Sequence, residues 1–406
     1  MFLDYTEEQA MLKKTIRRFV DHEIVPLEKE YDMNRPFSRE DIKTLWKKIL
    51  PFVWDPTQGA GILSSMPSGG KPSAGIMGTG IELDLIAMGI IIEEMFRGNA
   101  SLIATMLMSV APAGFIMMSS NQAMKDLYVL PLLMGEKIGC TSLTEPDYGS
   151  NSRDIKTTAV KKGDCWVING TKTWISNADI SDLTVLSCRC DDGDGILYTA
   201  QLLVDREVSP YETRELSHMG LKAFPTGEII FEDVKVPLNN KLSGRKESAG
   251  EGYKKTLMGF EVARTIMALG SVGMAQAAID ASTKYACQRR QFGKFIGEFQ
   301  MIQEMICDMV TMTESARLLA YRALSLIQTG KRAEEAACMA KQYATEMAVE
   351  VTSKAIQIHG AYGLSEEFPV ERLFRDARMF TIPDGTTQIQ KLIVARAALG
   401  GLSAIA

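Results

Sequence analysis

Histidine is scarce in this chain, and the few copies do not form a site. The 406 residues include only three histidines, His22, His218 and His359, which lie far apart in the sequence and lack the spacing of metal ligands. No H-E-x-x-H or G-x-S-x-G motif occurs either. We therefore expect no metal site and no serine-hydrolase chemistry.

A positive electrostatic field is also missing. The formal net charge is −5 and the isoelectric point is near 5.5, and no stretch alternates basic with aromatic residues. Such a chain has no basic surface for phosphate backbones, so nucleic acid is not expected as a partner. The G-x-G-x-x-G and P-loop motifs are absent as well, so any dinucleotide must bind in another way.

The cysteines form no recognisable disulfide framework. There are seven, they are scattered, and Cys188 and Cys190 have no second pair at zinc-binding spacing. The N-terminal sequence MFLDYTEEQA is acidic, whereas a signal peptide begins with basic residues followed by an apolar run. Both features predict reduced thiols in a cytoplasmic protein.

One stretch is long enough to cross a membrane. Residues 100–123 carry no charge and could nominally span a bilayer. Pro112, several serines and alanines, and the lack of a flanking basic cluster favour a buried pair of helices instead. We expect no membrane span.

The pattern of apolar residues divides the chain into three regions and predicts an α+β fold. Residues 1–137 are expected to form an N-terminal α-helical bundle that begins with a capping box at Thr6 and Gln9. Apolar residues then recur at helical spacing, at Met11, Ile16, Phe19, Val20 and Ile24. Residues 138–242 contain short β-rich runs and predict an antiparallel β-domain, and residues 243–406 predict a C-terminal four-helix bundle.

Two local signals add to this division. Residues 51–80 are dense in glycine, proline and serine and have no helical period, which predicts a long loop. The pair Asn169-Gly170 is a typical signal for a β-hairpin turn.

A short carboxylate stands in the segment TIPDGTTQIQ, residues 381–390. Pro383 restricts the backbone before Asp384 and Gly385 frees it afterwards, so the acid is expected in a rigid turn. Two interpretations are open from these residues alone. Asp384 either caps a helix that begins near Gln388, or it is a catalytic base.

Five segments occur in a fixed order between residues 142 and 396. They are SLTEPDYGSNSRD at 142–154, TKTWISNA at 171–178, FEDVKVP at 231–237, GMAQAAIDASTKYACQRRQFGKFIGEFQ at 273–300 and QIHGAYGLSEEFPVERLFRDARMFTIPDGTTQIQKLIVAR at 357–396. In these segments the chain resembles the acyl-CoA dehydrogenase family, whose flavoproteins carry T-E-P-x-x-G-S. Residues 51–80 depart strongly, because the family's connection there is usually short.

The resemblance implies FAD as the cofactor, bound by two groups of residues. The first group places the flavin against Leu143, Thr144, Gly149, Ser150, Trp174 and Ser176. The second group comes from a neighbouring subunit in this family and comprises Arg289, Phe292, Gln357 and Gly360, while Thr386 and Gln388 also touch FAD. Arginine suits this role because its planar fork pairs with phosphate oxygens. The arrangement implies a homotetramer built from two dimers.

The resemblance also places Asp384 where most members carry a glutamate. That glutamate removes the α-proton of an acyl-CoA thioester while a β-hydride passes to flavin N5. Some relatives carry the base on a central helix immediately before an arginine, a position that is Ala263 here. Substrate contacts are implied for Ser150, Glu261, Arg264, Gly385 and Arg396.

These features predict an FAD-dependent acyl-CoA dehydrogenase that passes electrons to an electron-transferring flavoprotein. The short acid, together with Pro383 where relatives often carry an aromatic ring, favours an alicyclic or α-branched acyl-CoA over an ordinary fatty acyl-CoA. An enoyl-CoA reductase and a non-dehydrogenating thioester lyase of the same fold stay open as alternatives. So does a non-enzymatic helical scaffold, which a visible spectrum would distinguish from a flavoprotein.

Overall fold

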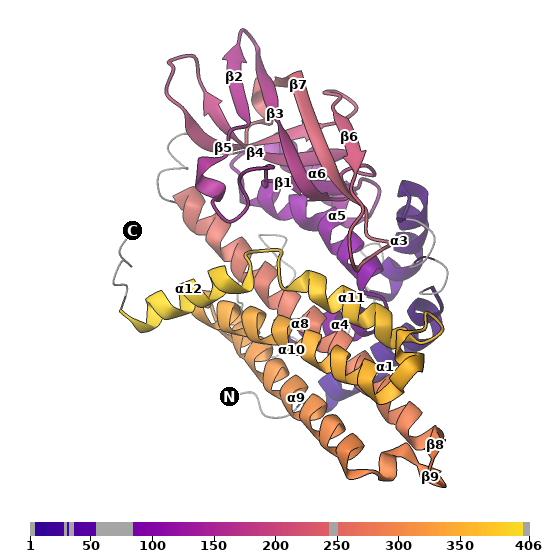
Figure 1. The fold of residues 1–406 in the computed structure, drawn as a ribbon. Coiled ribbons are helices and arrows are strands. Elements are labelled where there is room, and N and C mark those ends of the chain that lie inside the picture. Colours follow the sequence, from indigo (N-terminus) through magenta and orange to yellow (C-terminus); the bar gives the residue numbers. More distant parts are fainter. Residues whose placement is uncertain (1–4, 28–30, 32–35, 54–83, 243–250, 401–406) are drawn as a thin grey trace.

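The computed structural model describes residues 5–27, 31, 36–53, 84–242 and 251–400. Figure 1 shows a β-sheet at one end of an elongated molecule, with helices from both halves of the chain packed together beside it. The order of helical, β and helical regions agrees with the predicted α+β class. The boundaries expected after residues 137 and 242 stay predictions.

The N-terminal region is helical, as the apolar spacing predicts. Thr6 Oγ1 accepts a hydrogen bond from the Gln9 N–H at 3.2 Å, and Gln9 Oε1 accepts one from the Thr6 N–H at 3.1 Å, which confirms the capping box. Met11, however, is 70% exposed and lies outside the apolar stripe. The elements are α1 (Glu7–Phe19), η1 (Val20–Ile24), η2 (Val25–Leu27), α3 (Arg39–Val53), α4 (Leu85–Gly98), α5 (Ala100–Met118) and α6 (Gln122–Leu133).

The predicted start of the loop at residue 51 is wrong by three residues. Helix α3 continues through Pro51 to Val53, so three of those residues are helical. The rest of the predicted loop, residues 54–80, lies outside the described residues.

The middle region forms a seven-stranded sheet in the order β1-β4-β2-β3-β7-β6, with β5 paired to β4. Four pairings are antiparallel, but β1–β4 and β2–β4 are parallel, so the sheet is mixed. Parallel pairing needs long connections, and those between these strands are long enough. The strands are β1 (Gly139–Ser142), β2 (Thr158–Lys162), β3 (Cys165–Ser176), β4 (Leu183–Asp191), β5 (Tyr198–Asp205), β6 (Glu212–Glu215) and β7 (Thr226–Pro237).

The hairpin expected at Asn169-Gly170 is wrong. Both residues lie inside β3, and the turn of the β2–β3 hairpin is at Gly163 and Asp164 instead. The pairing of β3 with β7 shifts between Ile168 and Gly170, which marks a bulge. Gly170 has φ of +146°, and a Cβ there would lie 2.5 Å from Thr157 Oγ1, so the glycine serves a close approach rather than a turn.

The C-terminal region is a bundle centred on α10, which packs against α8, α9, α11 and α12. Its alanines allow this close packing, and Ala337, Ala340, Ala344 and Ala348 are fully buried. The elements are α8 (Glu251–Gln288), β8 (Arg290–Gln291), β9 (Lys294–Phe295), η6 (Ile296–Glu298), α9 (Gln300–Gln328), α10 (Glu334–His359), η7 (Gly360–Leu364), α11 (Pro369–Phe380) and α12 (Thr387–Ala398).

Two helices within the described ranges are long and apolar enough to cross a membrane by length and composition. They are α5 and the Phe260–Gln288 part of α8, and 50% and 67% of their most apolar windows are buried inside the protein. The uncharged stretch 100–123 forms one helix, α5, and reaches only the first two residues of α6, so the pair of helices predicted within it is wrong.

Candidate active site

The turn between α11 and α12 holds Asp384 in a strained conformation. Its φ is +55°, and that of Gly385 is +93°. The cap of α12 is Thr386, whose Oγ1 accepts a hydrogen bond from the Ile389 N–H at 3.4 Å. The interpretation of Asp384 as the helix cap is therefore wrong. A left-handed aspartate that caps nothing is the kind of strain that functional sites retain.

The turn is clamped through its own carbonyl groups. Gln390 Nε2 donates to the carbonyl oxygens of Asp384 at 3.0 Å and of Gly385 at 2.9 Å. Lys341 Nζ donates to Gly385 O at 2.9 Å, and Arg264 Nε lies 3.5 Å from Asp384 O. Helices α8, α10 and α12 thus all hold the backbone that carries the acid.

The carboxylate of Asp384 is left without a direct partner by this arrangement. Within the described residues, neither a hydrogen bond nor an ion pair reaches its side-chain oxygens. Burial raises the pKa of Asp384 above its usual value, and the positive charges of Lys341 and Arg264 oppose that rise. A half-buried, unpaired carboxylate with a raised pKa can accept a proton, as a general base must.

A second strained region lies at the end of the β-sheet. Trp174 has φ of +58° and is 57% exposed at the end of β3. Ser176 is half-buried beside it, and Asn177 (φ +63°) donates through Nδ2 to Thr105 O at 3.0 Å. A bulky aromatic side chain held in a left-handed conformation and open to solvent is suited to covering a planar ligand.

The segment that carries Leu143, Thr144, Gly149 and Ser150 is fastened to β3 by a buried ion pair. Lys172 Nζ donates to Glu145 Oε1 and to Leu143 O, both at 2.8 Å. Glu145 also accepts hydrogen bonds from the N–H groups of Lys156 and Thr157. Of the predicted ligands, Leu143 and Thr144 are half-buried, whereas Gly149 and Ser150 are exposed. The anchoring therefore leaves the predicted binding residues accessible.

The remaining predicted cofactor residues gather at the other end of the molecule. Figure 1 shows the β8–β9 hairpin projecting from the helices, at the end opposite the β-sheet. Phe292, at φ +49°, is 92% exposed at its tip. Arg289 lies with its guanidinium carbon 5.5 Å from the centre of the Tyr362 ring, and Gln357 and Gly360 are exposed nearby. Arg289 thus lies beside η7 (Gly360–Leu364), which directly follows Gln357 and His359 of α10, and the β8–β9 hairpin lies far from the sheet that carries Trp174.

The predicted substrate residues also fall into separate places. Arg264 is buried against the Asp384 turn, and the half-buried Glu261 lies one turn earlier on α8. Burial raises the pKa of Glu261. Arg396 is exposed near the end of α12, more than two turns from Asp384. Ser150 is also exposed, and it lies in the segment after β1. Thr386 is half-buried and Gln388 exposed beside the turn.

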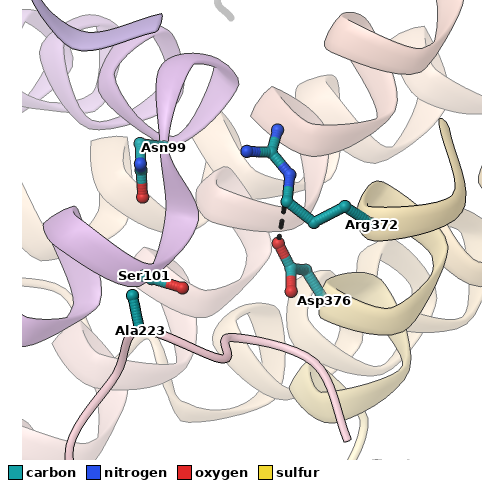
Figure 2. Close-up of a pocket in the computed structure, with 5 residues that line it drawn as sticks. All are labelled: Asn99, Ser101, Ala223, Arg372 and Asp376. Carbon is teal, nitrogen blue, oxygen red and sulfur yellow. Dashed lines mark ion pairs between the residues drawn. The ribbon is translucent and has the colours of Figure 1, made fainter. Parts of the chain in front are cut away.

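A small polar recess joins the sheet region to α11 (Figure 2). Five residues line it: Asn99, Ser101, Ala223, Arg372 and Asp376. Figure 2 shows the Asp376 carboxylate facing the Arg372 side chain, with Nε and Oδ2 3.9 Å apart. Asp376 also accepts a hydrogen bond from the Leu221 N–H. The recess has no room for a water molecule, so it is a joint between regions and not a substrate site.

Comparison with known proteins places these features in a family. The acyl-CoA dehydrogenase middle-domain model matches residues 140–234, and the acyl-CoA dehydrogenase C-terminal-domain model matches residues 250–399. The chain belongs to the acyl-CoA dehydrogenase family. It is 35% identical to the caffeyl-CoA reductase-Etf complex subunit CarC of Acetobacterium woodii, over 96% of this chain and 98% of the relative.

Two further relatives cover almost the full length of this acyl-CoA dehydrogenase. The glutaryl-CoA dehydrogenase of Desulfococcus multivorans is 34% identical over 98% of both chains. A solved structure of glutaryl-coenzyme A dehydrogenase with glutaryl-CoA has a TM-score of 0.85 and 34% identity, covering 100% of this chain and 98% of that one. The predicted family and α+β fold class are confirmed.

Members of this family are FAD-dependent oxidoreductases, and FAD is the cofactor of this enzyme. The residues present fit that group. Trp174 offers an exposed aromatic face, and a Cβ at Gly149 would meet nothing within 4 Å, so the backbone of 143–150 is open to a ligand. When bound, FAD supplies the acceptor for a hydride.

Sequence reasoning missed the residues that hold the site in place. Lys172, Lys341 and Gln390 are fully buried and Glu145 nearly so, and each contacts the backbone or side chains of a predicted site segment. A signal existed for Lys341, because it stands at the helical spacing of buried alanines at 337, 344 and 348. Lys172 in β3 and Glu145 in the segment after β1 carried no comparable signal.

Replacing Lys172 with methionine is expected to lower the free energy of unfolding by about 3–5 kcal/mol, since it leaves the buried Glu145 without its counter-charge. Burial raises the pKa of Glu145, but its hydrogen bonds outweigh that effect and the net pKa is lowered. The stabilisation is therefore present at neutral pH and lost as the pH falls through the folded-state value. Urea unfolding against pH measures this, with exposed Lys161→Met as the control. Equal stability of the two variants would contradict the prediction.

Proposed function

We propose that the enzyme dehydrogenates an acyl-CoA thioester between its α and β carbons, with Asp384 as the base. The observation that carries this proposal is the clamped turn, which presents one unpaired carboxylate in a left-handed conformation. Side chains from three helices hold the backbone carbonyl groups of the turn, which fixes the position of the acid and leaves its side-chain oxygens free. A base needs this combination of fixed position and free oxygens.

The proposed step begins with the α-proton. The α C–H bond breaks as a carboxylate oxygen of Asp384 takes the proton, and the electron pair moves toward the thioester carbonyl. The thioester carbonyl oxygen, which gains negative charge, needs a hydrogen-bond donor. The backbone N–H of Asp384 makes no hydrogen bond to any described residue. We assign this N–H as a donor to the thioester oxygen, where negative charge develops. The β C–H bond then breaks and its hydrogen leaves as a hydride, for which FAD would be the acceptor when bound, so that a double bond forms between the α and β carbons of an enoyl-CoA.

Electrons from this reaction are proposed to pass to an electron-transferring flavoprotein in the cytoplasm. The support is that the relative from Acetobacterium woodii is named as a subunit of a reductase-Etf complex. All seven cysteines are free, which agrees with a reducing compartment.

The same relative supports a second candidate, an enoyl-CoA reductase. Its name describes a caffeyl-CoA reductase, and reduction is the direction opposite to dehydrogenation. Both directions use the same acid, because Asp384 would return the proton to the α-carbon during reduction. Anaerobic mixing with saturated and unsaturated thioesters separates them. Bleaching of the flavin by a saturated thioester supports dehydrogenation, whereas reoxidation of reduced enzyme by unsaturated thioesters alone supports reduction.

We further propose that the second group of FAD contacts comes from another subunit of a homotetramer. Figure 1 shows the β8–β9 hairpin at the end opposite the sheet, and the exposed Phe292 lies at its tip. Arg289, just before the hairpin, contacts Tyr362 of η7, the segment that begins at Gly360 after Gln357. Residues so placed can serve a flavin only in a neighbouring copy. The exposed Phe292 ring has no covering group within its own described chain beyond an edge contact with Phe299.

Changing Arg289 to alanine is therefore expected to weaken FAD retention and dimer integrity together. Loss of one charged phosphate contact removes a hydrogen-bonded pair that the cofactor needs, so FAD should dissociate at least tenfold more readily. Gel filtration with light scattering and the ratio of flavin to protein absorbance measure both effects. Arg322→Ala, which removes another exposed arginine from α9, is the control. A variant that stays fully yellow and tetrameric would count against the shared site.

A further inference from the structure

A lysine is buried completely beneath the Asp384 turn. Lys341 lies on α10 with no exposed surface, among buried alanines of the same helix. Its Nζ donates to Thr381 O at 3.2 Å and to Gly385 O at 2.9 Å, so it contacts the turn on both sides of Asp384. A lysine is almost never buried without a specific role, because desolvating its charge is costly.

We propose that Lys341 is a positioning residue that holds the Asp384 turn by its carbonyl groups and keeps the Asp384 carboxylate ionised. This inference rests on the proposed role of Asp384 as the base. Lys341 does not form an ion pair with the carboxylate, so it leaves the carboxylate oxygens free for a proton. Its positive charge lies on the α10 side of the turn and favours the ionised form of the Asp384 carboxylate.

Charged groups from three sides face this pair. Burial lowers the pKa of Lys341 to about 8, while Asp384 and Glu346 act in the opposite direction. Arg264 on α8 adds a second positive charge near both groups. The remaining titratable neighbours on α8 and α10 are Glu261, Glu334 and Cys338. Lys341 is thus a buried cation beneath the Asp384 turn, with one positively charged neighbour, Arg264, and acidic neighbours in Asp384 and Glu346.

Gln390 offers a matched comparison within the same turn. It is fully buried and donates to the carbonyl oxygens of Asp384 and Gly385 without carrying a charge. Loss of Gln390 removes hydrogen bonds alone, whereas loss of Lys341 removes hydrogen bonds and a charge. The two variants therefore separate positioning from electrostatics.

Lys341→Met is expected to fold, because each carbonyl it contacts keeps another donor. Gly385 O retains Gln390 Nε2 at 2.9 Å, and Thr381 O retains the Thr387 N–H at 3.1 Å. Methionine fills similar volume without a charge to desolvate. Lys341→Arg keeps the charge and serves as the rescue variant.

The test measures α-proton exchange of a saturated thioester in D₂O by NMR, from pH 5 to 9, for the FAD-loaded enzyme and its variants. Lys341→Met is expected to exchange about tenfold or more slowly on the acid side, with the rising limb moved to higher pH, since removal of a nearby positive charge favours the protonated acid. Lys341→Arg should restore the limb. Gln390→Met should lower the rate at every pH without moving the limb.

A second measurement does not depend on turnover. The infrared carbonyl band of protonated Asp384, assigned by its absence in Asp384→Asn, should persist to higher pH in Lys341→Met than in the unmodified enzyme. An unmoved band and limb in Lys341→Met, with Asp384→Asn inactive, would overturn the role of Lys341 alone. Normal exchange in Asp384→Asn would overturn the proposed base and with it the role of Lys341.

Discussion

Asp384→Asn is expected to lower the rate of flavin reduction by several orders of magnitude, with FAD still bound and thioester affinity within about tenfold of the unmodified enzyme. The amide keeps the size of the side chain but cannot take a proton. The alternative position for a base, immediately before Arg264, holds Ala263, which cannot take a proton. Anaerobic stopped-flow absorbance measures the rate. Reduction at a near-normal rate would place the base elsewhere.

The pH profile gives an independent check on the same residue. The pKa of Asp384 is raised by burial, so its base form, and hence the rate of reduction, increases as the pH rises through that value. The same shift means that ionising Asp384 costs folding free energy above the ordinary pKa of an aspartate. The Asn variant should therefore be no less stable in urea than the unmodified enzyme. A marked loss of stability would attribute the lost activity to misfolding.

Much of the fold could be predicted because it depends on patterns within short segments. The capping box at Thr6 and Gln9, the helical spacing of the bundles and the β-rich middle region are all local properties. The mistakes arose where a distant contact overrides the local signal. Gly170 reads as a turn residue, yet it lies in a strand because Thr157 packs against the position of its missing side chain.

The candidate site shows the same division. The resemblance singled out Asp384 and Trp174 as candidates, but it could not show that both have positive φ or that Lys341 and Gln390 hold the turn. These contacts join residues more than forty positions apart in the case of Lys341 and Gly385. The contact proposed between Arg289 and the FAD of a neighbouring subunit depends on how two surfaces fit together, which no single sequence segment determines.

The clamp also bears on which acyl group the enzyme takes. Aspartate is one methylene shorter than glutamate, which withdraws the carboxylate by about 1.5 Å. A small shift of the backbone could compensate in a loose turn. Here Gln390 holds the carbonyls of Asp384 and Gly385, and Lys341 holds the carbonyl of Gly385 as well, so these hydrogen bonds oppose such a shift. The shorter reach must then be met by the substrate.

Substrates that are bulky at the α-carbon are therefore expected to be preferred, and Asp384→Glu is expected to reverse that preference. Pro383 is exposed on the turn beside the acid. The resemblance to the family implies an aromatic ring at this position in many relatives, so we expect the smaller proline to leave more space beside the shortened side chain. An alicyclic or α-branched acyl group fills that space and brings its α-proton within reach of Asp384. For a straight chain the reacting atoms lie too far apart, and a displacement of this size costs about a hundredfold in rate.

The measurement compares kcat/KM for cyclohexanecarboxyl-CoA, isobutyryl-CoA, butyryl-CoA and octanoyl-CoA. The unmodified enzyme should favour the first two, and the Glu variant should gain on the straight chains while losing on the cyclic one, because the longer acid collides with the filled pocket. Pro383→Tyr is the matched variant on the neighbouring position, and it should reduce activity with the cyclic thioester by filling the same space without moving the acid. Preference of the unmodified enzyme for butyryl-CoA or octanoyl-CoA would show that the turn places Asp384 as far forward as a glutamate, and the bulky substrate would be excluded.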